Sequence, residues 1–477
     1  MLLPISCLTV LLFLPLTNGQ CRGDPVEDVC SSLWPRPSFV EVLPNVQDGQ
    51  TCFQDVQSRF SSFSSAPVER AWQRFLLDLK TKNTAKGPVP SQISALSRPC
   101  LSLLIEISLD HNDNGTIDSS SSEFYRLRIH GGNVSIRARG SAGAVYALVT
   151  LSQLIVCVSS TLCVVPNVLI RDVPAFRHRG IMLDTARHFI PVSLIKQTLD
   201  LMALNKLNVF HWHLTDDESF PVELLDNRSR ALTRGAYAKD LVYTQNQIRD
   251  IVQYASERAI RVLPEIDVPG HTQSWAIGLP EIVCNRRVLN PRLSRTYDVL
   301  DAVIGELSSL FPEAHFHIGG DEVVRDLWKV NCTGDLSVDA DDLNEFFHEK
   351  VSTILRRYER RGIVWSDAGL RATGVEGPIV QFWQTTSLED VRRMLESGQN
   401  LILSNNDASY LDCGLILWCG GRKTWWDILT NRLFQLLRPG LPTPGNVLGG
   451  ELAMWTECLE LFSPLCDIIA KVYCRRG

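Results

Sequence analysis

Residues 205–217 read NKLNVFHWHLTDD, an apolar run that is followed at once by polar and acidic residues. The run Leu207–Trp212 has the length and composition of a buried β-strand. Similar runs recur along the chain, and the set of eight is Ile181–Leu183, Leu207–Trp212, Arg261–Pro264, Ala314–Ile318, Ile363–Trp365, Ile379–Phe382, Leu401–Ser404 and Val447–Met454.

Helical patterns separate most of these runs. They are Leu194–Leu204, Gln245–Arg258, Tyr297–Leu310, Asp342–Arg360 and Ser387–Ser397. Eight strands joined by crossover helices are the requirement of a (β/α)₈ TIM barrel, so we predict an α/β protein with this barrel at residues 173–477. A doubly wound parallel sheet is the alternative, but no glycine-rich phosphate loop supports it.

A smaller domain is predicted before the barrel, at residues 21–172. Its strand candidates are Leu101–Ile107, Phe124–Ile129, Asn133–Arg139 and Leu162–Ile170, with an Ala- and Leu-rich helical segment at 141–156. Three strands, a helix and another strand indicate a small α+β domain, in which the helix covers one face of the sheet.

The composition is that of an ordinary globular protein. The chain has 477 residues and a formal net charge of −6, with 45% hydrophobic and 21% charged residues. Collagen-like and low-complexity classes are excluded. The chain has no block of Lys and Arg, so a nucleic-acid partner is not expected. The only long apolar run is N-terminal, so no internal membrane span is expected.

Residues 1–20, MLLPISCLTVLLFLPLTNGQ, resemble a secretory signal peptide that lacks a basic start. An uncleaved anchor is the alternative, although Pro4 and Pro15 interrupt the apolar run. We therefore expect entry into the secretory pathway, with a lysosomal or secreted destination. Glycosylation sequons fit this route, at Asn114, Asn133, Asn227 and Asn331.

Cysteine use points to the same compartment. The chain has 14 Cys, of which Cys7 would leave with the signal peptide. An exported chain is expected to pair some of the remaining 13, and the odd number leaves at least one thiol unpaired or intermolecular. Our candidate pairs are Cys52–Cys100 and Cys284–Cys332.

Chemically active residues follow the predicted strands, where the active site of a TIM barrel lies. These segments are Asp184–His188, Asp216-Asp217, Glu265–His271, Asp321-Glu322, Trp365-Ser366-Asp367, Trp383, Tyr410-Leu411-Asp412 and Trp455-Thr456-Glu457. Aromatic faces pack on pyranose rings, while carboxylates and Arg bond to sugar hydroxyls. The pattern therefore predicts a sugar site.

A metal site is the competing interpretation of one motif. His211 and His213 alternate on a predicted strand, so both point to one face. With Asp216 and Asp217 nearby, they superficially match the ligands of a metal-dependent hydrolase. A hydrogen-bonded pair inside the barrel is the simpler interpretation, and we predict neither a metal nor another cofactor. Loss of activity on chelation would favour the metal.

Five motifs together resemble the β-N-acetylhexosaminidases of glycoside hydrolase family 20. They are LDTARHF (183–189), NKLNVFHWHLTDD (205–217), PEIDVPGHTQSW (264–275), HIGGDE (317–322) and GGELAMWTE (449–457). The resemblance covers about residues 30–458, both the small domain and the barrel. It implies an exo-acting enzyme that removes terminal β-linked N-acetylglucosamine or N-acetylgalactosamine from glycans. Members of the family are often dimers, so a homodimer is expected.

The resemblance also implies a role for each matching residue. Asp321 and Glu322 correspond to the catalytic pair, and Arg187 to the arginine that holds the terminal sugar. The other substrate-binding matches are Asp216, His271, Trp365, Trp383, Tyr410, Asp412, Trp455 and Glu457. In this family the 2-acetamido group of the substrate is the nucleophile, so the reaction is retaining without a protein nucleophile. Gly319 and Gly320 would let the adjacent carboxylates both reach the site.

The chain departs from the family pattern in three places. Residues 284–290, CNRRVLN, are short where many relatives carry a longer loop. No Trp stands immediately before Tyr410. Residues 459–471 predict only a partial final helix, which makes the last helix of the barrel shortened or atypical. A sugar-binding protein with impaired catalysis is therefore the alternative function.

Overall fold

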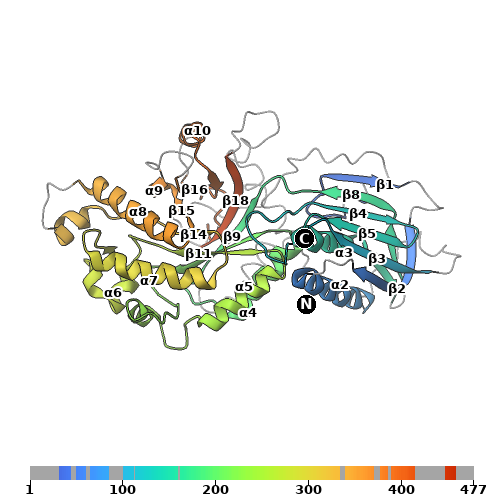
Figure 1. The fold of residues 1–477 in the computed structure, drawn as a ribbon, viewed down its shortest axis with the longest axis horizontal. Coiled ribbons are helices and arrows are strands. Elements are labelled where there is room, and N and C mark those ends of the chain that lie inside the picture. Colours follow the sequence, from blue (N-terminus) through green and yellow to red (C-terminus); the bar gives the residue numbers. More distant parts are fainter. Residues whose placement is uncertain are drawn as a thin grey trace.

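The computed structural model describes residues 29, 32–43, 50–60, 65–84, 100–111, 113–159, 162–333, 339–369, 377–384, 388–413 and 446–457. The predicted signal peptide at 1–20 and the predicted final helix at 459–471 lie outside these residues. The described chain forms a barrel and an adjoining sheet domain (Figure 1).

The barrel is closed and all of its neighbouring strands are parallel. Its strands in chain order are β9 (His178–Asp184), β10 (Val209–Thr215), β11 (Arg261–Ile266), β14 (His315–His317), β15 (Arg361–Trp365), β16 (Ile379–Phe382), β17 (Leu401–Leu403) and β18 (Val447–Met454). The pairing of β18 with β9 closes the ring. The predicted TIM barrel is confirmed.

The predicted crossover helices are also present. They are α4 (Val192–Leu204), α5 (Gln245–Ser256), α7 (Ser294–Leu310), α8 (Ala340–Arg357) and α10 (Leu388–Glu396). Shorter elements stand in the loops, namely η3 (Arg230–Gly235), α6 (Gln273–Gly278), η4 (Pro280–Ile282), β12 (Val283–Cys284), β13 (Val288–Leu289), η5 (Trp328–Thr333) and α9 (Ser366–Gly369).

The first barrel strand is longer than predicted. The apolar pattern indicated only Ile181–Leu183, whereas β9 runs from His178 to Asp184 and is buried throughout. His178, Arg179 and Asp184 are polar but lie inside the protein. A search for apolar residues predicts such strands too short. Their buried polar residues form hydrogen bonds or ion pairs with partners that are distant in the sequence, so they need not be apolar.

The small domain contains more strands than predicted. Its mixed eight-stranded sheet has the order β1-β8-β4-β5-β3-β2-β7-β6. The strands are β1 (Phe39–Val42), β2 (Gln50–Phe60), β3 (Leu101–Leu109), β4 (Tyr125–His130), β5 (Asn133–Ala138), β6 (Val156–Ser159), β7 (Leu162–Pro166) and β8 (Val168–Asp172). The predicted strand at 162–170 is therefore two strands, separated at Asn167.

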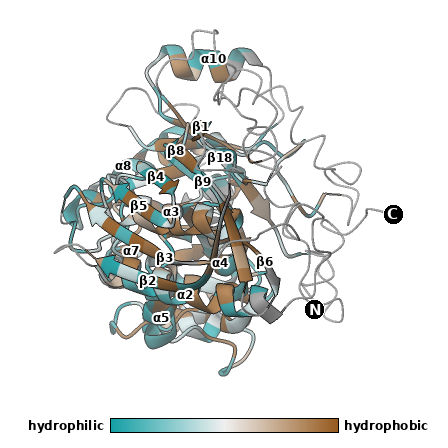
Figure 2. Cartoon of the chain, turned by 90° about the vertical axis from the view of Figure 1, so that its right-hand side faces the viewer, coloured by the Kyte–Doolittle hydropathy of each residue, from teal (hydrophilic) through white to brown (hydrophobic). Residues whose placement is uncertain are grey.

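Two helices, not one, cover one face of this sheet. They are α2 (Ala66–Thr84) and α3 (Ser141–Leu154), and both share a hydrophobic core with the sheet. Burial alternates along β4 and β5, as expected for a sheet with one covered face, and brown and teal residues mix along the strands in Figure 2. The helices lie on the side of the sheet that faces the barrel (Figure 1).

Buried ion pairs join the small domain to the barrel. Arg179 at the start of β9 contacts Glu123 at 2.5 Å, and Lys206 before β10 contacts Asp172 of β8 at 3.0 Å. The Arg179 and Lys206 side chains are 5% and 3% exposed. Both cations therefore depend on a carboxylate of the other domain for compensation.

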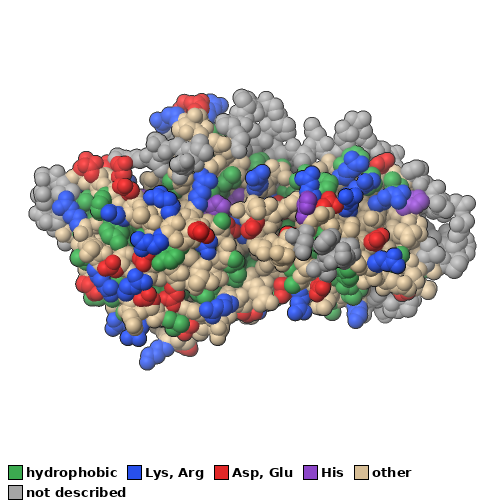
Figure 3. Space-filling model, in the orientation of Figure 1, with side chains coloured by type: hydrophobic (Ala, Val, Ile, Leu, Met, Phe, Trp, Pro, Cys, Tyr) green, Lys and Arg blue, Asp and Glu red, His purple; other side chains and the backbone are tan. Residues whose placement is uncertain are grey.

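Both candidate disulfides are confirmed, as Cys52–Cys100 and Cys284–Cys332. A third, Cys157–Cys163, joins β6 to β7 and was not predicted. Disulfides are typical of proteins that fold in the secretory pathway. Within the described part of the chain, every helix is too short or too polar to cross a bilayer. On the face shown in Figure 3, basic, acidic and hydrophobic side chains are interspersed.

Candidate active site

The predicted catalytic pair follows β14 on a strongly turned loop. Gly319 and Gly320 have φ angles of +66° and +93°, and Glu322 has φ +50°. A Cβ on Gly319 would lie 1.9 Å from Oδ1 of Asp267, so no larger residue fits there. The turn lets both Asp321 and Glu322 approach His271, as the two glycines predicted.

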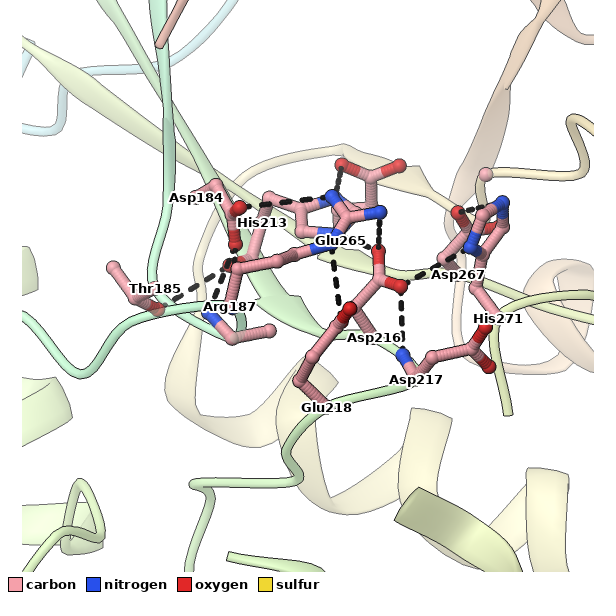
Figure 4. Close-up of polar contacts among 12 residues, drawn as sticks. Asp184, Thr185, Arg187, His213, Asp216, Asp217, Glu218, Glu265, Asp267 and His271 are labelled. Carbon is pink, nitrogen blue, oxygen red and sulfur yellow. Dashed lines mark hydrogen bonds and ion pairs between the residues drawn. The ribbon is translucent and has the colours of Figure 1, made fainter. Parts of the chain in front are cut away.

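Arg187 lies in a pocket of carboxylates at the ends of β9 and β10 (Figure 4). Its Nη2 is 2.8 Å from Asp216, and its Nε is 3.3 Å from Glu218. Asp184 and Glu457 lie 3.6 and 3.8 Å from Nη1. These charges fix the guanidinium, and its buried Nη1 donates no hydrogen bond to the described residues.

Asp216 connects Arg187 to the catalytic loop. It accepts hydrogen bonds from His213 at 2.7 Å and from His271 at 3.1 Å. Burial opposes its ionisation, but the charges of Arg187 and His271 outweigh burial and hold the pKa of Asp216 far below its usual range. His271 places its other ring nitrogen 3.7 Å from Glu322. Glu322, the predicted general acid, thus faces His271, which is held in place by the ionised carboxylate of Asp216.

Asp321 is poised to accept a hydrogen bond. Its Oδ1 is buried and receives none from the described residues. Burial raises the pKa of Asp321 to about 6, aided by the charges of Glu265, Asp367 and Glu322 and opposed by that of His271. An unsatisfied buried acceptor is costly, so this oxygen marks a place for a donor on a ligand.

The predicted aromatic residues lie together next to the carboxylates. Trp365, Tyr410 and Trp455 form one buried cluster, and Trp383 packs against it. The Trp383 and Tyr410 rings are stacked with centroids 6.5 Å apart, and Trp455 lies 4.9 Å from the Arg187 guanidinium. Residues from four different strand ends therefore build one aromatic wall beside the charged groups.

The loop after β17 brings Tyr410 and Asp412 to the same wall. Tyr410 bridges to Ala453 of β18, and the neighbouring backbone continues the pairing between 409–411 and Ala453. Asp412 is only 2% exposed, and its charge is one cause of the raised pKa of Tyr410, after burial and Asp321. The missing Trp before Tyr410 has not moved this loop away from the site.

A buried network of histidines and carboxylates supports the site from below. Glu265 lies 2.6 Å from His213, 2.9 Å from His211 and 3.0 Å from His317, and accepts a hydrogen bond from Nε1 of Trp365 at 2.9 Å. Burial opposes charge on His211, but Glu451 and Glu265 raise its pKa to about 9. Glu265 thus orients both the aromatic wall and the histidine that holds Asp216.

This network bears on the metal interpretation. His211, Glu265 and His317 offer ligand atoms within 4.8 Å of one another. Both ring nitrogens of His211 already face carboxylates, Glu451 at 2.7 Å and Glu265 at 2.9 Å. A cation would have to displace one of these contacts, so the geometry favours the hydrogen-bonded pair over the metal site.

Comparison with known families decides the membership of the chain. The model of the glycosyl hydrolase family 20 catalytic domain matches residues 176–461, and the model of family 20 domain 2 matches residues 33–173. The chain belongs to glycoside hydrolase family 20. The resemblance stated from the five motifs is confirmed.

Relatives of this family 20 chain include enzymes from animals and bacteria. The β subunit of β-hexosaminidase from Homo sapiens is 36% identical over 383 residues, 75% of this chain and 66% of that protein. A chitooligosaccharidolytic β-N-acetylglucosaminidase from Bombyx mori is 31% identical over 481 residues, 89% of this chain and 78% of that protein. A Flavobacterium johnsoniae chitobiase structure has a TM-score of 0.70 at 27% identity, covering 89% of this chain and 65% of that one. The chain spans about two thirds of the human and bacterial proteins.

Sequence reasoning missed one carboxylate of this family 20 site, Glu218, and gave no role to two that it placed at strand ends, Glu265 and Asp367. Glu218 contacts Arg187, Glu265 is the hub of the buried network, and Asp367 bonds to the catalytic loop. Glu218 directly follows Asp216-Asp217, so it was within reach of the strand-end argument, which already included Asp367. The contacts of Glu265 depend on which residues of separate strands face the barrel interior, which one strand cannot reveal.

The Glu265→Ala variant is expected to lower the free energy of unfolding by about 3–5 kcal/mol. The substitution leaves the charges of His211 and His213 buried without Glu265. Urea unfolding checks the value, with the exposed Glu281→Ala as control, for which the change should stay within about 0.5 kcal/mol. A loss below about 1 kcal/mol for Glu265→Ala would show that the histidines lose their charge at little cost.

Proposed function

We propose that this chain is an exo-β-N-acetylhexosaminidase that hydrolyses terminal β-linked N-acetylglucosamine or N-acetylgalactosamine from glycoconjugates, with retention and assistance from the 2-acetamido group. One observation carries the proposal. The buried Oδ1 of Asp321 accepts no hydrogen bond from the described residues and lies in a site walled by aromatic rings. An acetamide N–H is a donor that would satisfy it.

The charged pocket of Arg187 suits the hydroxyls of a terminal sugar. The guanidinium has one nitrogen without a hydrogen-bond partner among the described residues, and Asp216 and Glu457 supply acceptors beside it. The face of Trp455 lies 4.9 Å from the guanidinium. Hydroxyls would bond to the charges while the ring of the sugar packs on the indole, which supports recognition of a chain end.

In the first step the acetamide carbonyl oxygen of the substrate attacks the anomeric carbon. The glycosidic C–O bond breaks, and protonated Glu322 donates its proton to the leaving oxygen. Anionic Asp321 accepts the acetamide N–H and stabilises the positive charge that develops on the oxazolinium ring. His271, 3.7 Å from Glu322, then faces the carboxylate left behind.

In the second step Glu322 acts as the base. It takes a proton from water, the water oxygen bonds to the anomeric carbon, and the ring C–O bond to the acetamide oxygen breaks. Two displacements at one carbon give net retention.

The decisive test is turnover of a chromogenic β-N-acetylglucosaminide by the purified chain. Absence of turnover by a folded chain would leave the sugar-binding alternative, and loss of turnover after chelation would revive the metal.

The pH dependence should report Asp321. Its pKa of about 6 is raised, so the anion needed for catalysis is lost as the pH falls through 6. We expect kcat/KM, which reports the free enzyme, to fall below pH about 6. A bound acetamide N–H favours the anion, so the corresponding limb of kcat should lie at lower pH. If the acid limbs of kcat and of kcat/KM lay at the same pH, this role of the acetamide would be contradicted.

Asp412 is proposed to lie near the 6-position of the sugar and to disfavour a 6-sulfate. Two unit charges about 4–6 Å apart cost about 1–4 kcal/mol in a partly wet site, which predicts a preference for neutral sugars of about tenfold or more. Asp412→Asn should weaken this preference and change turnover of neutral substrates much less. The check is the ratio of kcat/KM for neutral and 6-sulfated substrates in both proteins, and an unchanged ratio would refute the placement.

We further propose a lysosomal or secreted destination and a homodimer. The disulfides Cys52–Cys100, Cys157–Cys163 and Cys284–Cys332 support an oxidising route, and the human relative is named as a subunit of β-hexosaminidase. Light scattering of the purified chain tests the dimer.

Domain limits at residues 21–172 and 173–477 are proposed as well. The break between β8 and β9 supports this division.

A further inference from the structure

The short helix α9 packs directly against the catalytic loop. The backbone N–H of Trp365, the last residue before α9, donates to the Gly319 carbonyl oxygen at 3.0 Å. A Cβ on Gly320 would lie 2.8 Å from the Cβ of Ala368. The end of β15 and the first turn after it therefore form the surface on which the loop carrying Asp321 and Glu322 rests.

Asp367 in this turn uses each of its carboxylate oxygens for a different part of the site. Oδ2 accepts the backbone N–H of Glu322 at 3.1 Å. Oδ1 accepts Nε1–H of Trp383 at 3.2 Å. One side chain thus bonds both to the residue proposed as the general acid and to the indole proposed to wall the substrate.

The backbone at Glu322 needs such support. Its φ of +50° is in the left-handed region, which a residue with a side chain adopts only when its surroundings enforce it. The Glu322 side chain is itself 60% exposed, so packing does not hold it. The hydrogen bond from its N–H to Asp367 constrains the backbone of Glu322 directly.

We propose that Asp367 is a positioning residue, which fixes the direction of the Glu322 carboxyl relative to Trp383 and thereby aligns the proton donor with the glycosidic oxygen of the bound sugar. This inference rests on the proposed function. Asp367 does not touch the substrate in this role. It acts through the two groups to which it is hydrogen-bonded.

A carboxylate is required at this position because two donors face it. An amide of the same shape has one acceptor oxygen, and its NH₂ group would stand against the second N–H donor. Asp367→Asn therefore loses one of the two hydrogen bonds while its volume is kept. Asp367→Glu keeps both acceptor oxygens and the charge, but moves them by one methylene.

The charge of Asp367 supplies an independent readout. It is one of the charges acting on Asp321, which are those of His271, Glu265, Asp367, Glu322 and Asp267. Removal of a neighbouring negative charge favours the anion of Asp321, so the acid limb of kcat/KM should move to lower pH in Asp367→Asn. It should stay in place in Asp367→Glu. This shift tests the electrostatic interaction between Asp367 and Asp321, while the difference between good and poor leaving groups tests the positioning of Glu322.

The experiment compares the wild type, Asp367→Asn, Asp367→Glu and a control, Asp298→Asn, which alters an exposed carboxylate of α7. Kinetics are measured with 4-nitrophenyl N-acetyl-β-glucosaminide, which has a good leaving group, and with the β-linked N-acetylglucosamine disaccharide, which has a poor one. We expect Asp367→Asn to lower kcat at least tenfold for the disaccharide and less for the nitrophenyl substrate, with KM changed less than threefold. Asp298→Asn should match the wild type.

The opposing results are equally defined. Wild-type kinetics in Asp367→Asn, or equal losses on both substrates, would overturn the positioning role. If Asp367→Asn does not fold, Asp367→Glu decides, since a displaced carboxylate should still impair the disaccharide more than the nitrophenyl substrate. An inactive wild type would overturn the proposed function instead, so the two failures are distinguishable.

Discussion

Glu322→Gln is expected to lower kcat by about 10²–10⁴-fold, the usual contribution of a general acid and base. Glutamine keeps the shape of the side chain but has no acidic proton for the leaving oxygen. Substrate binding should survive, so KM should change much less than kcat. Steady-state kinetics with the disaccharide of N-acetylglucosamine measure the loss.

The leaving group provides the control for this variant. A nitrophenolate leaves with little protonation, so the penalty on the first step should shrink for the nitrophenyl substrate. The exposed Glu281→Gln, in η4, serves as the matched substitution and should leave kcat unchanged. Equal losses for the good and the poor leaving group would remove Glu322 from the acid role.

Asp321→Asn is expected to lower kcat by about 10²–10³-fold, by analogy with the loss of one preorganised electrostatic partner in other active sites. The amide can still occupy the pocket but has no charge to stabilise the oxazolinium ring. The acid limb of kcat/KM that Asp321 causes should also disappear. A pH series of kcat/KM on wild type and variant tests both statements.

The substrate offers a second test of the same step. Since the nucleophile belongs to the 2-acetamido group, a β-glucoside without that group should be a very poor substrate of the wild type. Asp321→Asn should then cost little on this already poor substrate. Efficient glucoside hydrolysis, or a sugar bound covalently to a protein carboxylate, would contradict the mechanism.

The sequence predicted those parts of the molecule that a few neighbouring residues determine. The apolar run Leu207–Trp212 marked β10, and the order of eight such runs indicated the barrel. HIGGDE joined a strand to two glycines and two carboxylates, so the position of Asp321 and Glu322 followed from a few adjacent residues. The same holds for Arg187, which stands three residues after β9 ends.

The parts that were missed depend on contacts across the fold. Strand β2 was overlooked because most of its residues after Phe53 are polar and partly exposed. Helix α2 could have been found, since Val68, Ala71, Trp72, Phe75 and Leu79 have helical spacing. The significance of Asp367 could not, because it arises only when the chain brings β15 beside β14 and sets a carboxylate against the N–H of Glu322.

Two buried ion pairs bind the small domain to the barrel, Arg179 with Glu123 and Lys206 with Asp172. Evolution is therefore expected to keep the two domains together in one gene. A gene fragment that encoded the barrel alone would leave Arg179 and Lys206 without their carboxylate partners. Fusion and truncation points therefore belong outside this pair of domains, and recombination that preserves the fold must carry both together.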